Sequence, residues 1–318
     1  MRSAICGRSD NKGLGNMTWE FCRHINPEKI MLINNRFTRN LDRFPGATLI
    51  KTKSPSDKDL LKFLEGIDIV LTFETPYNRD LFIIAKKMGV KSVMIPMFEL
   101  LNDKWIKPDL FICPSKLDYD VANGNKIFLP WPVNDKVLKR RRPKKAETFL
   151  FNTGRGGMLK RNSLDEMHNV IKMCKGVKFV VNNQKHFDIE NYWDLWKEGD
   201  VFVFPHKFAG LSLPIQEAMA TGLPVITTDF YPFNEIIPKE LLIKPYDVTK
   251  EVIAREIDLH YVSVQAIADK IKEVASWSPE RIGELSDKAY EYSQNITWEK
   301  LLPKYLEILN KLVNNEKL

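Results

Sequence analysis

The sequence predicts an α/β protein with two doubly wound, Rossmann-like domains facing a cleft. Three observations support this fold class. The chain has 318 residues, enough for two domains of ordinary size. Short apolar segments alternate with amphipathic ones along most of its length, as in parallel sheets that helices cover on both faces. The alternation is interrupted once, by a segment rich in proline and basic residues.

Residues 1–134 are predicted to form the N-terminal domain. Helices are expected at residues 57–66 and 79–89, where the apolar spacing is helical, and at 17–24, after a Gly13-Leu14-Gly15 loop. Six segments read as short buried strands: residues 29–34, 48–52, 67–74, 91–97, 109–115 and 126–130.

Residues 135–147 are predicted to be a basic linker. Seven cations and no acid lie between Lys136 and Lys145, which matches the net charge of +7. Two interpretations stay open: a solvated linker, or a contact with a polyanion such as DNA or a membrane surface. The residues assigned to such a contact are Lys139, Arg140, Arg141 and Arg142.

Residues 148–296 are predicted to form the C-terminal domain, and residues 297–318 a separate last helix. Strands are expected at residues 148–154, 177–182, 200–205 and 224–229. Helices are expected at residues 163–175 with Ser163 as N-cap, and at 214–221, 264–277, 279–293 and 297–313.

Composition excludes several classes of protein. No apolar segment approaches the ~20 residues that a spanning helix needs, and the N-terminus lacks the apolar core of a signal peptide, so a cytoplasmic protein is expected. Four scattered cysteines predict free thiols instead of a disulfide scaffold or zinc site.

The segment 200–229 carries the strongest functional signal. A loop with Gly210 follows an apolar strand, and Ser212 and Pro214 then open a helix. Unpaired N–H groups and the helix dipole make such an N-terminus a site for anions. Glu217 lies about one turn further along, where its carboxylate can accept hydrogen bonds from a ribose diol; the alternative is an ordinary surface Glu.

This segment resembles the donor-binding signature of the retaining GT-B glycosyltransferases of family four, E-G-F-G-L-P-x-x-E-A-M-A-x-G-x-P-V-I. The resemblance implies that Glu217 holds the ribose and that the N–H groups of Gly210, Leu211 and Ser212 meet the distal phosphate and sugar. The first of the two Glu residues in this signature falls on Ala209 here. The identity of the transferred sugar and the enzymatic activity therefore stay open. The matching positions are Gly210, Leu213, Pro214, Glu217, Ala218, Met219, Ala220, Gly222, Pro224, Val225 and Ile226.

A second segment resembles the loop that clamps the diphosphate in the same family. Gly154-Arg155-Gly156 follows a predicted strand, and Lys160-Arg161 comes shortly after. Fixed cations there would neutralise the departing diphosphate of a UDP-, GDP- or ADP-sugar, with no further cofactor. The alternative for these glycines is a simple turn.

Candidate acids for the acceptor side follow two strands of the N-terminal domain. Glu74 and Glu99 are each expected just past the carboxyl end of a strand, where a carboxylate can orient or deprotonate a hydroxyl. Asp118-Tyr119-Asp120 has the D-x-D pattern of a metal site, but we interpret these acids as lying on a helix surface and predict no metal.

The resemblance therefore implies a metal-independent, retaining transfer of a hexosyl or pentosyl group to an acceptor hydroxyl. Arg155, Lys160, Glu74 and Glu99 are the expected catalytic residues. Modified DNA, a glycan and a lipid are candidate acceptors. Two alternatives stay open: a non-catalytic nucleotide-sugar or glycan-binding protein, and a nucleic-acid-binding protein, although no known motif of the latter is present.

Overall fold

The computed structural model describes residues 1–10, 12–34, 38, 40–153, 158–182 and 192–318. Its contacts divide the chain into two compact units, each an α/β body built on a parallel sheet. Unit 1 comprises Met1–Trp131, Ile253–Arg255 and Trp298–Leu318. Unit 2 comprises Pro132–Val252 and Glu256–Thr297.

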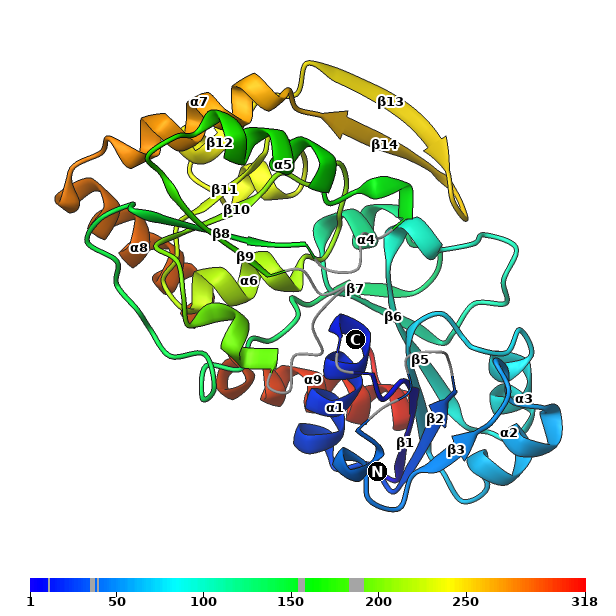
Figure 1. The fold of residues 1–318 in the computed structure, drawn as a ribbon. Helices are drawn as coiled ribbons and strands as arrows, with labels where there is room; N and C mark the ends of the chain where they lie inside the picture. The colour runs from blue at the N-terminus through cyan, green and yellow to red at the C-terminus, as the bar shows by residue number, and fades with distance from the viewer. Residues whose placement is uncertain (11, 35–37, 39, 154–157, 183–191) are drawn as a thin grey trace. The chain divides into compact units, whose positions relative to one another are not determined.

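The sheet of unit 1 has seven parallel strands in the order β3-β2-β1-β4-β5-β6-β7 (Figure 1). The strands are β1 (Ser3–Gly7), β2 (Lys29–Ile33), β3 (Thr48–Ile50), β4 (Ile69–Glu74), β5 (Lys91–Pro96), β6 (Leu110–Cys113) and β7 (Lys126–Phe128). The sequence analysis missed β1, which is central. Its five residues S-A-I-C-G lack the β-branched and aromatic enrichment that marks a strand.

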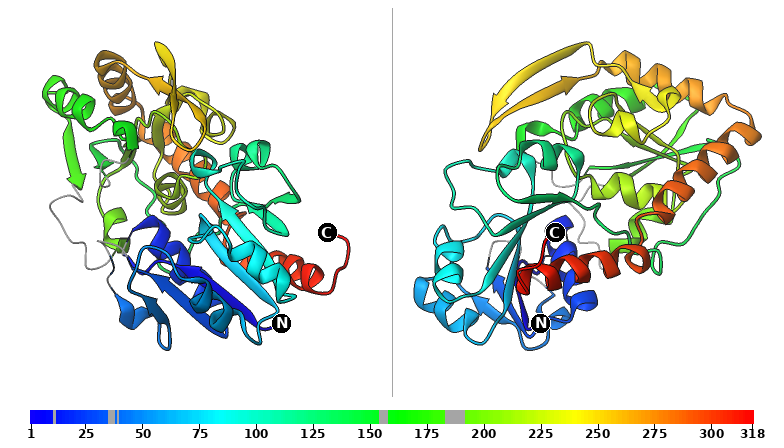
Figure 2. Two further views of the ribbon diagram at one scale, coloured as in Figure 1. Left: turned by 90° about the vertical axis from the view of Figure 1, so that its right-hand side faces the viewer. Right: turned by 180° about the vertical axis from the view of Figure 1, so that it is seen from behind.

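Among the described residues of unit 1, the α-helices are α1 (Gly13–Ile25), α2 (Asp57–Leu64), α3 (Leu81–Lys87), α4 (Lys116–Val121) and α9 (Trp298–Val313). A capping box between Ser56 and Asp59 fixes the start of α2. Helices α2 and α3 pack their apolar side chains on one face of the sheet. On the other face, the Phe21 ring of α1 lies 5.2–5.4 Å from the rings of Phe73, Trp131, Trp298 and Tyr305, which brings α9 against this unit (Figure 2).

Helix α1 begins at Gly13, so the prediction that Gly13-Leu14-Gly15 forms a loop is wrong. The glycines form the first helical turn instead. A Cβ on Gly15 would lie 1.7 Å from the carbonyl oxygen of Asp10, a distance that no side chain tolerates. The glycine there allows the close approach of the helix to the chain that leaves β1.

The sheet of unit 2 has five parallel strands in the order β12-β11-β10-β8-β9. They are β8 (Thr148–Asn152), β9 (Lys178–Asn182), β10 (Val201–Phe204), β11 (Val225–Thr228) and β12 (Leu242–Ile243). Its helices are α5 (Leu164–Met173), α6 (Leu213–Ala220), α7 (Val264–Ala275) and α8 (Pro279–Gln294). Helices α5 and α7 pack together over one face of the sheet, and α6 and α8 over the other (Figure 1).

An antiparallel hairpin, β13 (Asp247–Val252) with β14 (Glu256–Tyr261), was not predicted. Strand β14 carries a signal that could have found it, because buried Ile257 and Leu259 alternate with exposed acids. Short 3-10 helices complete the described chain: Leu41–Arg43, Phe98–Leu100, Met158–Lys160, Tyr192–Trp196, Phe233–Glu235 and Lys239–Leu241.

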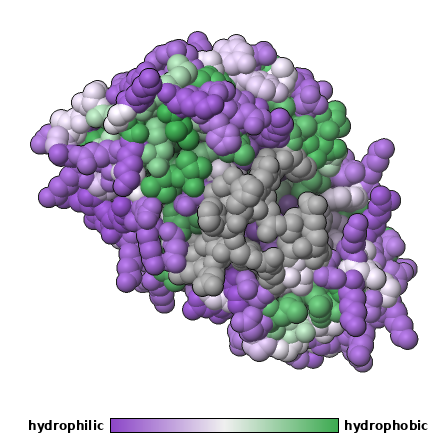
Figure 3. Space-filling model, viewed as in Figure 1, coloured by the Kyte–Doolittle hydropathy of each residue, from purple (hydrophilic) through white to green (hydrophobic). Residues whose placement is uncertain are grey.

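Hydrophilic side chains cover most of the face drawn in Figure 3. In the part of the chain that the structure describes, no helix combines the length and the apolar character needed to cross a membrane. All four cysteines have free thiols.

Candidate functional site

The strand order of unit 2 reverses between β8 and β10. The chain passes from β8 to the edge strand β9, then returns to the other side of β8 to form β10. Loops that leave two such strands meet at the carboxyl end of the sheet, which is where doubly wound folds bind ligands. Both predicted donor segments are these loops: one follows Asn152 at the end of β8, and the other follows Phe204 at the end of β10.

The loop after β8 is described in part. Gly154, Arg155 and Gly156 lie outside the described residues. Leu159 and Lys160 both have left-handed backbone conformations, with φ of 52° and 50°, which non-glycine residues adopt only at a cost in energy. The Lys160 ammonium lies 2.9 Å from a carboxylate oxygen of Asp165, but its side chain is 80% exposed, so this ion pair is weak.

Ser163 follows the same loop and occupies the N-cap position of α5, as predicted. It makes no capping hydrogen bond through its side chain, because its backbone is left-handed, with φ of 50°. A backbone contact helps to define this helix end: the Met167 N–H donates to the Ser163 carbonyl at 2.9 Å.

Arg161 joins the two loops. The Lys207 N–H, in the loop after β10, donates to the Arg161 carbonyl at 2.9 Å. The Arg161 guanidinium carbon lies 5.6 Å from the centre of the Phe208 ring. The Arg161 guanidinium thus lies beside the loop after β10, and its role in binding a diphosphate stays a prediction.

Helix α6 begins immediately after this second loop. Ser212 occupies its N-cap position, and Pro214 lies in the first turn, which contains no acidic residue. The Ser212 Oγ is buried and has no hydrogen-bond partner among the described residues. An N-terminus that has no acid and holds an unpaired buried hydroxyl fits an anionic ligand.

Glu217 is buried in α6, with 6% of its surface exposed. All six residues from Ile215 to Ala220 are buried, and the helix packs against α8 and β11. The alternative that Glu217 is a surface acid on this helix is therefore wrong. Ala209 is also buried, so the position of the family's first Glu is filled by a methyl group.

Lys207 is a residue of this region that the sequence analysis missed. Its side chain is 10% exposed, and its ammonium lies 3.0 Å from Glu166 of α5 and 5.0 Å from the centre of the Tyr261 ring. Its carbonyl accepts a hydrogen bond from His260 N–H at 2.8 Å. Lys207 thus connects the loop after β10 to α5 and β14. The signal that could have identified it is a lysine in the loop that directly follows a buried strand.

His206, beside Lys207, is buried and stacks on Phe204 with ring centres 3.5 Å apart. Burial lowers the pKa of His206 well below its usual value, and the nearby Arg161 guanidinium lowers it further. The imidazole is therefore neutral at physiological pH and adds no charge to the loop.

In unit 1, both predicted acids follow strands, but their surroundings differ. Glu74 ends β4 with a left-handed backbone, φ 67°, and its carboxylate lies 3.8 Å from the Arg8 guanidinium. Glu99 lies in the short helix Phe98–Leu100 after β5 and is buried, with 6% exposed. The strain at Glu74 favours a functional position at the end of β4.

Asp118 is fully buried, which corrects the prediction that it lies on a helix surface. Its carboxylate accepts hydrogen bonds from the Phe98 N–H at 2.6 Å and from the Ser115 hydroxyl, and the Asp118 N–H donates to the Ser115 Oγ at 3.1 Å. Ser115 therefore caps α4, and Asp118 ties this helix to the segment that carries Glu99. In the described part of the chain no group of three or more His, Cys, Asp or Glu side chains can hold a metal ion.

The burial of Asp118 predicts a pH-dependent stability. Burial raises the pKa of this carboxyl to about 7, the Ser115 hydrogen bond opposes the rise, and Glu99 adds to it. The unfolded pKa is about 3.9, so the folded state binds the extra proton between about pH 4 and 7. Relative to Asp118→Asn, the wild type should lose free energy of unfolding as the pH rises through this window. Urea denaturation of both proteins across this pH range measures the difference in their free energy of unfolding. Parallel pH profiles of the two proteins would contradict a raised pKa at Asp118.

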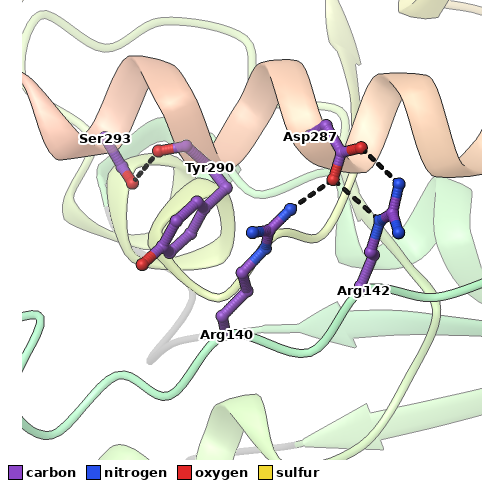
Figure 4. A network of polar contacts seen from close by, with 5 residues as sticks. All are labelled: Arg140, Arg142, Asp287, Tyr290 and Ser293. Carbon is purple, nitrogen blue, oxygen red and sulfur yellow. Dashed lines mark hydrogen bonds and ion pairs between the residues drawn. The ribbon is translucent and has the colours of Figure 1, made fainter.

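The basic segment is attached to unit 2 by specific contacts. Arg140 and Arg142 both pair with Asp287 of α8, and Arg142 does so with two hydrogen bonds of 2.9 and 2.7 Å (Figure 4). The Arg141 N–H donates to the Thr221 carbonyl at 2.7 Å, and its guanidinium donates to the Trp196 carbonyl at 3.3 Å. The three arginines therefore hold the segment against the domain, which a freely solvated linker would not do. Polyanion binding by Lys139 and its neighbours stays a prediction.

Comparison with known proteins gives a family match for the part of the chain that contains this site. Residues 135–260 match a family model described as glycosyl transferases group 1, and this range includes both donor segments. No curated protein matches the sequence significantly.

Solved structures show the same two-domain architecture. HepE from Anabaena, in complex with UDP, is 10% identical with a TM-score of 0.70, and the match covers 98% of this chain and 100% of that one. Sucrose-phosphate synthase from Thermosynechococcus elongatus is 13% identical with a TM-score of 0.65, covering 99% and 100%. The pneumococcal O-GlcNAc transferase GtfA, with UDP and GlcNAc, is 14% identical with a TM-score of 0.55, covering 80% and 59%. The chain has the GT-B fold, as predicted.

Proposed function

We propose that this protein is a glycosyltransferase that moves a sugar from a nucleoside-diphosphate sugar to an acceptor hydroxyl. One observation carries the proposal: at the carboxyl ends of β8 and β10, the Arg161 loop meets the loop that leads into α6, the helix of buried Glu217. The family match over residues 135–260 supports it. The UDP complexes of HepE and GtfA support a UDP-sugar over GDP- and ADP-sugars as the donor.

In this proposal unit 2 holds the donor. The N–H groups of Gly210, Leu211 and Ser212 contact the distal phosphate and sugar. The first turn of α6, which begins at Leu213, positions these N–H groups. Glu217 accepts hydrogen bonds from the ribose hydroxyls. Arg155, Lys160 and Arg161, in the predicted loop that also contains Gly154 and Gly156, neutralise the diphosphate.

The chemical step is a substitution at the anomeric carbon with retention. The bond from this carbon to the diphosphate oxygen breaks, a bond to the acceptor oxygen forms on the same face, and the acceptor proton passes to the leaving phosphate. Unit 1 holds the acceptor, and Glu74 and Glu99 orient its hydroxyl. Cations fixed around the diphosphate stabilise the charge that develops on it, so no divalent metal is needed.

Stereochemistry and metal dependence test this mechanism together. Each UDP-, GDP- and ADP-sugar is incubated with the protein in water, with and without EDTA, and proton NMR follows the anomeric signal of the released sugar. We expect slow hydrolysis with the anomeric configuration of the donor retained, at the same rate in EDTA. An inverted product, or a rate that EDTA abolishes and Mg²⁺ or Mn²⁺ restores, would exclude the proposed step.

A further inference from the structure

A hollow of about 580 Å³ lies in unit 1, just past the carboxyl end of β4. It is lined by residues 75–80 together with Ser54 and Trp105. Its volume falls in the range of small-molecule pockets, about 300–1,000 Å³. The strand order of unit 1 reverses between β1 and β4, so the hollow occupies the part of a doubly wound sheet that binds ligands.

The loop that forms this hollow is held in one conformation. Tyr77, like Glu74 before it, has a left-handed backbone, with φ of 60°. The Ser54 hydroxyl donates to the Tyr77 carbonyl at 2.7 Å, and the Asn78 amide donates to the Pro55 carbonyl at 2.8 Å. Strained residues persist only where their surroundings fix them. The lining is therefore preorganised, which reduces the entropy that a ligand would lose on binding.

The lining combines aromatic rings with neutral and oppositely charged polar groups. Trp105 and Tyr77 are half-buried and pack on the hydrophobic core, so each ring has a firm backing. Arg79 and Asp80 are exposed neighbours of opposite charge, and the Arg8 guanidinium outside the lining faces Glu74. The charges thus balance, whereas a polyanion site needs an excess of cations.

A sugar ring fits this combination of groups. Its C–H faces stack on an aromatic ring, and its adjacent hydroxyl groups bind carboxylate, amide and guanidinium groups in pairs. We propose that the hollow binds a sugar ring of the acceptor through Trp105, Arg79 and Asp80, so that the acceptor is an uncharged saccharide. This inference rests on the proposed glycosyltransferase function and names the substrate class of its acceptor side.

The test measures saccharide binding and donor hydrolysis separately on the same proteins. Saturation-transfer NMR is recorded with glucose, galactose, N-acetylglucosamine, maltose and lactose, and binding is titrated for each sugar that gives a signal. The variants are Trp105→Ala, Trp105→Phe, which keeps an aromatic ring on the core, and Asp80→Ala, which removes an exposed side chain. Trp277→Ala, at a half-buried tryptophan of unit 2, is the matched control.

We expect at least one sugar to bind the wild type and the Trp277→Ala control equally. Affinity should fall about tenfold or more in Trp105→Ala, less in Trp105→Phe, and measurably in Asp80→Ala, with hydrolysis of the nucleotide-sugar unchanged. The inference is overturned when no sugar binds, when Trp105→Ala and Asp80→Ala bind as well as the wild type, or when sugar is transferred to duplex DNA or anionic vesicles instead. If the wild type hydrolyses none of the nucleotide-sugars, that result counts against the proposed function and not against saccharide binding in the hollow.

Discussion

Replacement of Glu217 by alanine is expected to weaken binding of the nucleoside-diphosphate sugar by about 1.5 to 3 kcal/mol, the range for hydrogen bonds to a charged group. The carboxylate is buried in α6, where the helix fixes its position and water competes little for its oxygens. Two ribose hydroxyls donating to it are therefore lost together. Isothermal titration with the donor, and with the free nucleoside diphosphate, measures the effect.

Two further variants make this result specific. Glu217→Gln keeps the volume of the side chain and one acceptor oxygen, so its affinity should lie between those of the wild type and Glu217→Ala. Gln216→Ala removes a neighbouring buried side chain, whose Oε1 has no hydrogen-bond partner among the described residues, and should leave donor affinity nearly unchanged. Equal losses in Gln216→Ala and Glu217→Ala would mean that the helix was merely perturbed.

Replacement of Arg155 or Lys160 by alanine should lower kcat more than it weakens donor binding. The diphosphate gains charge as the glycosidic bond breaks, so a cation that contacts it stabilises the transition state more than the ground state. Loss of one such group costs roughly 10²- to 10³-fold in rate in comparable anion sites. Steady-state hydrolysis kinetics and donor titration on each variant separate the two effects.

The exposed ion pair of Lys160 supplies the control for this prediction. Asp165→Asn removes the carboxylate that lies 2.9 Å from the Lys160 ammonium, and should not slow the reaction because the lysine stays free to reach the diphosphate. Lys175→Ala, an exposed lysine that follows α5, should also have no effect. A Lys160→Ala variant whose donor affinity falls as much as its kcat/KM would assign this lysine to ground-state binding only.

Local patterns predicted most of the fold. Strands such as β4 and β5 are rich in apolar residues and lie between turn signals, and the structure places them within two residues of the predicted bounds. Strand β1 was not predicted, because S-A-I-C-G becomes a strand only through pairing with β2 and β4 on its two sides. Tertiary pairing of this kind is not visible in a local window of sequence.

Some features of the candidate site could likewise be predicted from the sequence, and others could not. The helix of Glu217 and its position after β10 could be predicted, because an unbroken stretch of sequence encodes the strand, the loop and the helix. The pairing of Lys207 with Glu166 joins residues on separate elements, and the burial of Asp118 depends on the segment at Phe98. Only the folded chain brings these partners together.

Binding of a nucleotide-sugar to the intact protein tests the central claim most directly. A panel of UDP-, GDP- and ADP-sugars is titrated calorimetrically against the wild type and Glu217→Ala. The account predicts that one nucleotide class binds the wild type, with a UDP-sugar expected, and that this affinity falls in Glu217→Ala. Absence of binding by every member of the panel, or an affinity that Glu217→Ala leaves unchanged, would contradict it.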